Sequence, residues 1–67
     1  MKIDARGLSC PEPVLLTQRA IHDGETEIET QVDMNISKEN VKRCMENAGY
    51  SVEVVEEGDE YTVKGKK

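Results

Sequence analysis

The chain alternates between a two-residue period and a helical period, and this order restricts its fold more than any other feature of the sequence. From Glu25 to Asp33, threonine and branched aliphatic residues alternate strictly with acidic or amide residues. This pattern indicates a strand with one buried and one solvated face. A half-buried strand needs a second layer to cover its apolar side. The side chains expected on the buried face are Thr26, Ile28, Thr30 and Val32.

The segment from Pro11 to about His22 has the period of a helix that could supply this layer. Asp23-Gly24 then ends the helix, with glycine near its usual C-terminal position. Leu15 falls on the polar side and is expected to be exposed. The predicted apolar face consists of Pro13, Val14, Leu16, Thr17, Ala20 and Ile21.

A second helix is predicted to begin at Ser37, a good N-cap residue, and to end before Gly49. With this cap, Ile36 and Val41 occupy the positions of a hydrophobic staple. The apolar residues that follow at helical spacing are Val41, Cys44, Met45 and Ala48. We therefore assign Cys44 to the core.

Three shorter segments complete the pattern: a first strand at 2–5, and two final strands joined by a turn at Glu57-Gly58-Asp59. The sequence predicts an α/β (α+β) two-layer sandwich in the order β-α-β-α-β-β. Two helices cover one face of a four-stranded mixed sheet. The first strand–helix–strand unit is expected to be a right-handed crossover, and the last two strands an antiparallel hairpin. The whole range 1–67 is expected to form a single domain.

Size and composition exclude several function classes. A chain of 67 residues can hide only about 60% of its unfolded surface, so reactive chemistry is expected on the outside. The net charge is −5 and only 3% of residues are aromatic, which disfavours direct nucleic-acid binding. The longest apolar run, Val14-Leu15-Leu16, is too short for a signal peptide or membrane span. Two cysteines without an export signal indicate free thiols in a reducing compartment, the cytoplasm.

The segment Cys10-Pro11-Glu12-Pro13 carries the chemistry we expect of this chain. The sequence predicts Cys10 as the N-cap of the first helix, with the prolines at N1 and N3, where a missing N–H breaks no helical bond. A thiol at a helix N-terminus is shifted towards thiolate. The N–H of Glu12 is the expected hydrogen-bond donor to the sulfur. Arg6 could add positive charge, which the carboxylate of Glu12 opposes, so we expect the pKa of Cys10 to be modestly lowered.

Other readings of these residues are weaker. A thioredoxin-like enzyme needs Cys-x-x-Cys, and Pro13 occupies the second cysteine position. Cys10, Cys44 and His22 lack the spacing of a metal site. His22 suits the last turn of a helix as a cation. The acidic residues on and near the strands form either a solvated face or a docking surface for a basic partner; they are Glu27, Glu29, Asp33, Glu53 and Glu56.

The motif resembles the signature of the TusA/SirA-like family of sulfur-carrier domains. The residues that carry the resemblance are Asp4, Arg6-Gly7-Leu8 and Cys10-Pro11-Glu12-Pro13-Val14-Leu15, and it continues to Gly49. The resemblance implies the same two-layer fold. It also implies that Cys10 accepts a persulfide sulfur from a donor protein, such as a cysteine desulfurase, and passes it to an acceptor protein thiol.

By the same resemblance, Pro11 and Pro13 shape the site together with Gly7 and Glu12, and Asp4 and Arg6 hold the preceding turn. No cofactor or metal is implied, and the activity is that of a sulfurtransferase-type persulfide carrier. Many members have an Asp-Pro pair after the second strand, whereas Asp33 is followed here by Met34. The stretch 37–43 is more similar to the N-terminal domain of YedF-type proteins of selenium metabolism. The alternative function is a non-catalytic regulatory or interaction domain, with exposed Leu8 and Leu15 near the motif.

Overall fold

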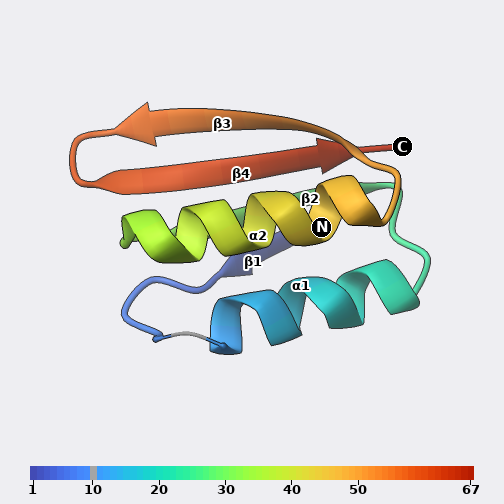
Figure 1. The fold of residues 1–67 in the computed structure, drawn as a ribbon, viewed down its shortest axis with the longest axis horizontal. Coiled ribbons are helices and arrows are strands. Elements are labelled where there is room, and N and C mark those ends of the chain that lie inside the picture. The colour runs from blue at the N-terminus through green and yellow to red at the C-terminus, as the bar shows by residue number, and fades with distance from the viewer. Residues whose placement is uncertain (10) are drawn as a thin grey trace.

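The computed structural model describes residues 1–9 and 11–67; Cys10 lies outside the described residues. The predicted β-α-β-α-β-β order is confirmed, and Figure 1 shows the helices beside one another against the sheet. None of the described helices is long and apolar enough to cross a membrane. The elements are β1 (Lys2–Asp4), α1 (Glu12–His22), β2 (Glu27–Val32), α2 (Asn35–Asn47), β3 (Ser51–Glu57) and β4 (Glu60–Lys66).

The sheet is mixed, with the strand order β1-β2-β4-β3. β1 pairs with β2 in parallel, as the helical crossover between them requires. β2 and β3 both pair with β4 in antiparallel orientation. Because β2 lies between β1 and β4, its ladder is occupied on both sides, and β1 and β3 form the edges of the sheet.

β2 has one buried face, as its alternating sequence predicts. Ile28, Thr30 and Val32 are buried, whereas Thr26 precedes the strand and is exposed. The prediction that Thr26 lies on the buried face of the strand was therefore wrong. The core beneath this face consists of Ile3, Ala5, Ala20, Ile28, Val32, Val41, Met45, Tyr50 and Val63.

α1 buries Pro13, Thr17 and Ala20, with Leu15 54% exposed as expected. The Thr17 hydroxyl donates to the Pro13 carbonyl oxygen at 2.9 Å and lies 3.1 Å from the hydroxyl of Thr30 on β2. These two threonines meet their hydrogen-bonding needs inside the core, because each offers a partner to the other. The prediction that Leu16 is buried was wrong, since 37% of it is exposed.

The predicted start of α2 was also wrong. The helix begins at Asn35, with Met34 as its N-cap in an extended conformation, and Ser37 lies inside its first turn. Packing explains the shift, because an earlier start places Ser37, Val41 and Met45 on one inward stripe. Ser37 is buried, and its hydroxyl has no hydrogen-bond partner in the part of the chain that the structure describes. Ile36 is 60% exposed, so the predicted staple with Val41 does not form.

The C-terminal hairpin turns at Gly58 and Asp59, as predicted, with Gly58 at a φ of 61°. Gly65 on β4 is buried under α2, where an added Cβ would lie 2.5 Å from the sulfur of the fully buried Met45. Tyr50, which sequence analysis did not assign to the core, is buried and donates a hydrogen bond to the Glu25 carbonyl oxygen.

We expect Gly65→Ala to lower the free energy of unfolding by about 1–3 kcal/mol, because the methyl group overpacks the contact with Met45. Urea denaturation measures this change. The control is Lys64→Ala, one position away on the exposed face, which should change stability by no more than about 0.5 kcal/mol. Equal stability of the two variants would contradict the close packing of Gly65.

Candidate functional site

The predicted site residues surround the connection between β1 and α1. Cys10, the proposed sulfur-bearing residue, lies outside the described residues, but both its neighbours in the chain are described. Ser9 and Pro11 are exposed. Asp4 ends β1, Arg6 and Gly7 follow it, and Glu12 and Pro13 form the first turn of α1. The chain therefore gathers these residues at one end of the molecule.

The N-terminus of α1 is placed one residue later than predicted. Pro11 is the N-cap, and its carbonyl oxygen accepts the first helical bond, from the N–H of Leu15 at 3.0 Å. Pro13 therefore occupies N2 rather than N3, still among the positions whose N–H has no partner within the helix. Glu12 donates its N–H to the Ser9 carbonyl oxygen at 3.0 Å. The predicted hydrogen bond from this N–H to the sulfur of Cys10 lies outside the described residues.

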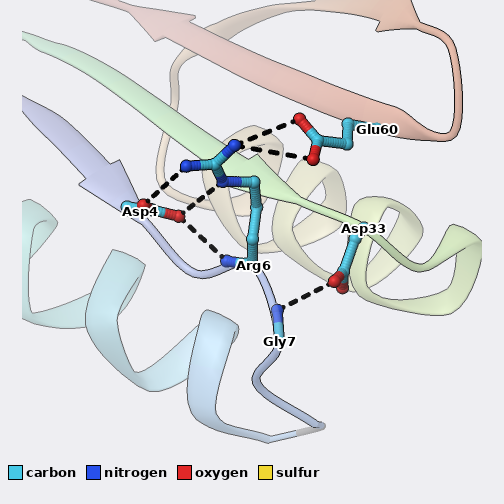
Figure 2. Close-up of polar contacts among 5 residues, drawn as sticks. All are labelled: Asp4, Arg6, Gly7, Asp33 and Glu60. Atoms are coloured by element: carbon cyan, nitrogen blue, oxygen red, sulfur yellow. Dashed lines mark hydrogen bonds and ion pairs between the residues drawn. The ribbon is translucent and has the colours of Figure 1, made fainter.

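Arg6 binds two carboxylates, as Figure 2 shows. Its Nε donates to Asp4 Oδ1 at 2.9 Å and its Nη2 to Asp4 Oδ2 at 3.0 Å, a two-pronged contact. The backbone N–H of Arg6 adds a bond of 3.2 Å to Asp4 Oδ1. On the other side of the guanidinium, Nη1 donates to Glu60 at 3.3 Å and 3.5 Å. Arg6 thus joins the end of β1 to the beginning of β4.

These contacts change the protonation of the pair. The side-chain hydrogen bonds from Arg6, followed by its backbone N–H, lower the pKa of Asp4 to about 2. The hydrogen bonds and charge of Asp4, and then the charge of Glu60, raise the pKa of Arg6. Arg6 is therefore charged at all relevant pH values. Two carboxylates face its guanidinium, which limits the positive charge that it can offer to a thiolate at Cys10.

Gly7 and Asp33 form a second tether between the motif and β2. Gly7 has a φ of 79°, in the left-handed region that favours glycine, and donates its N–H to Asp33 Oδ2 at 2.9 Å. The carboxylate points at the loop in Figure 2. Leu8 is half-buried against the core, so the prediction that it is exposed was wrong. Its N–H reaches back to the Ala5 carbonyl oxygen at 3.3 Å.

Cys44 lines a shallow hollow between the two helices and does not belong to the buried core. The hollow has a volume of about 320 Å³ and is also lined by Pro11, the N-cap of α1, and by Val14. Cys44 is a half-buried free thiol, which corrects its assignment to the core. Burial raises the pKa of Cys44, and a hydrogen bond with Gln18 partly offsets the rise. The thiolate of Cys44 is therefore disfavoured at neutral pH.

Most of the predicted acidic face is solvated and partly neutralised across strands. Glu29 lies 3.8 Å from the ammonium group of Lys64, and Glu27 lies 3.7 Å from that of Lys66. Glu56, which pairs in register with Tyr61, lies three positions after Glu53 on β3. Because side chains alternate along a strand, the two point to opposite sides of the sheet. In the described ranges 1–9 and 11–67, no group of three or more His, Cys, Asp or Glu side chains could hold a metal ion.

The roles of Asp33 and Glu60 at this site were not predicted from the sequence. Asp33 was assigned to the acidic face, although its carboxylate binds the Gly7 N–H. Glu60 lies 54 positions from Arg6 in the chain. The glycine turn predicts the hairpin that contains Glu60, but no pattern in the sequence predicts that the side chain of Glu60 contacts Arg6.

Comparisons with known proteins support the fold and indicate a family. The family model of the sulfurtransferase TusA matches residues 1–67. A Methanocaldococcus jannaschii protein named "Putative sulfur carrier protein" is 44% identical over 59 residues, covering 84% of this chain and 77% of that protein. The crystal structure of a SirA-like protein from Desulfitobacterium hafniense superposes with a TM-score of 0.86 at 30% identity. That match covers 97% of this chain and 93% of the other.

We expect the carboxyl group of Asp4 to titrate with a pKa of about 2 in the folded protein, against an ordinary value of 3.8. Because folding lowers this pKa, the stabilisation is present above pH 3.8 and is lost as the pH falls towards 2. An NMR titration of the Asp4 side-chain carbon measures it. In Arg6→Gln the midpoint should return towards 3.8; an unchanged midpoint in that variant would show that Arg6 is not the cause.

Proposed function

The chain belongs to the TusA family, and on this basis we propose that it is a sulfur carrier that holds a persulfide on Cys10. The observation that carries the proposal is the family match over residues 1–67, with the motif from Asp4 to Pro13 intact. The described contacts support it, because they hold the segment before Cys10 to β2 and β4. Cys44 suits the role poorly, since burial raises its pKa.

The proposed reaction has two steps of thiol–persulfide exchange. In the first, the thiolate of Cys10 attacks the outer sulfur of a persulfide on a donor protein. The sulfur–sulfur bond of the donor breaks, the donor thiolate leaves, and a persulfide forms on Cys10. In the second, a thiolate of an acceptor protein attacks the outer sulfur carried by Cys10. The outer sulfur moves to the acceptor, and the sulfur of Cys10 leaves as a thiolate. Each step breaks one sulfur–sulfur bond and forms another, so no external oxidant or reductant is consumed.

The N-terminus of α1 is the feature that would favour the thiolate in both steps. The helix dipole gives this end a partial positive charge that stabilises an anion close to the first turn. Arg6 contributes little, since two carboxylates face its guanidinium. Glu12, which is exposed in the first turn, opposes the effect. We propose that the helix N-terminus prevails and modestly lowers the pKa of Cys10, so that Cys10 is both a good nucleophile and a good leaving group near neutral pH.

The proposed partners are a sulfur donor protein, such as a cysteine desulfurase, and an acceptor protein with a reactive thiol. An exposed site suits both, because Ser9 and Pro11 on either side of Cys10 are exposed. Between transfers Cys10 has to remain a free thiol, which is typical of a reducing compartment, so we propose that the reaction takes place in the cytoplasm. Asp4, Arg6, Gly7, Pro11, Glu12 and Pro13 are proposed to shape the site.

A cysteine desulfurase supplied with cysteine should add the mass of one sulfur atom to the intact protein, as read by mass spectrometry without reductant. Cys44→Ala should be modified to the same extent, because we assign the sulfur to Cys10. Cys10→Ala should remain unmodified. Equal modification of the two variants would contradict the assignment, and a Cys10→Ser variant that keeps full activity in the cell would favour a non-catalytic interaction domain.

We also expect the two thiols to differ in reactivity towards iodoacetamide. At pH 7.5, Cys10 in the Cys44→Ala variant should react about tenfold faster than Cys44 in the Cys10→Ala variant, because burial raises the pKa of Cys44. Unfolding both variants in urea should remove the difference. Similar rates in the folded proteins would argue against a special environment for Cys10.

A further inference from the structure

Glu60 contacts the motif segment although it lies far from it in the sequence. Its carboxylate accepts hydrogen bonds from Arg6 Nη1 at 3.3 Å and 3.5 Å, across 54 positions of the chain. Figure 2 shows the guanidinium between Glu60 on one side and Asp4 on the other. Glu60 is thus a point of attachment for residues 4–7, independent of the tether from Asp33 to Gly7.

Glu60 belongs to the sheet, so its backbone position is set by strand pairing. Glu60 is the first residue of β4 and pairs in register with Glu57 across the two-residue turn. The ladder between β4 and β2 begins at the next residue, Tyr61, which pairs with Val32. The segment 5–9, by contrast, has no regular secondary structure. The ion pair therefore connects an irregular segment to the hairpin end of β4.

The ion pair is too exposed to contribute much to global stability. The side chains of Arg6 and Glu60 are 42% and 47% exposed, and pairs of this kind add little to the free energy of unfolding. What the contact does is select an orientation. Asp4, at the end of β1, accepts a hydrogen bond from Nη2 of Arg6. Glu60, on β4, accepts one from Nη1, so the two carboxylates fix the orientation of the guanidinium.

We propose that Glu60 is a positioning residue for sulfur transfer: through Arg6 it fixes the direction in which the segment before Cys10 leaves the sheet. The inference rests on the proposed function of Cys10. Glu60 touches Arg6 rather than the sulfur, so its removal changes how often Cys10 is aligned for attack. A small misplacement of a reacting atom lowers the rate of a displacement reaction without a matching loss of binding.

The test measures sulfur transfer from a cysteine desulfurase to this protein over a range of carrier concentrations, in a Cys44→Ala background. Glu60→Ala should lower kcat about three- to tenfold and leave KM within about twofold. Glu60→Gln should recover most of the rate, because the amide oxygen still accepts from Arg6 Nη1. The matched control is Glu57→Ala, which removes an acidic side chain on the other side of the turn, with no described ion pair to Arg6.

Two further measurements separate positioning from folding and from a general charge effect. Arg6→Gln combined with Glu60→Ala should be no slower than the slower single variant, since both act through one contact. The unfolding temperatures of Glu60→Ala and Glu57→Ala should agree within about 2 °C. Additive losses of rate, a change in KM alone, or equal kcat values for Glu60→Ala and Glu57→Ala would overturn the role of Glu60.

Failure of the proposed function has a different signature. If the wild-type protein accepts no sulfur, the carrier assignment is wrong, and the same variants are then compared by the rate at which iodoacetamide alkylates Cys10. A slower or faster rate in Glu60→Ala than in Glu57→Ala, restored in Glu60→Gln, supports the positioning role without any sulfur donor. Equal alkylation rates in the three variants overturn it.

Discussion

The structure depends on the register of β2, because this strand builds the core and also places the motif segment. Ile28, Thr30 and Val32 face the helices, and a slip of one residue would turn Glu29 and Gln31 into the core instead. β1 and β4 pair with β2 from opposite sides. The hydroxyls of Thr30 and Thr17 then lie 3.1 Å apart and join the strand to α1. Immediately after the strand, Asp33 binds the N–H of Gly7.

The distribution of charge follows from this two-layer arrangement. The helices carry four basic and three acidic residues, so the net charge of −5 arises from the strands and connections. On the open face of the sheet, cross-strand pairs with Lys64 and Lys66 offset part of the negative charge. At the motif end, Asp4 and Glu60 face the guanidinium of Arg6, and the carboxylate of Asp33 points at Gly7. A thiolate near this cluster would depend on the N-terminus of α1 rather than on Arg6 for its stabilisation.

Local patterns in the sequence predicted most of the fold and only part of the site. The spacing of apolar residues in 27–32 and 12–22 determines which faces of this strand and helix are buried. The glycines at 24, 49 and 58 lie where helices or strands end. The start of α2 was missed because an inward stripe of Ser37, Val41 and Met45 prevails over the capping preference of serine. The Arg6–Glu60 pair was missed for a different reason: it joins residues 54 positions apart, and no spacing rule relates them.

A carrier of this size cannot enclose its chemistry, and the contacts at the motif are consistent with that constraint. A small domain can present a reactive group on its surface, where two different protein partners can reach it in turn. The partners would then supply the enclosure, and the carrier needs only to offer the group in a defined direction. Exposed ion pairs suit this task, because they set orientation while adding little to stability. The segment before Cys10 is accordingly held by the carboxylates of Asp4, Asp33 and Glu60 in addition to the burial of Ala5.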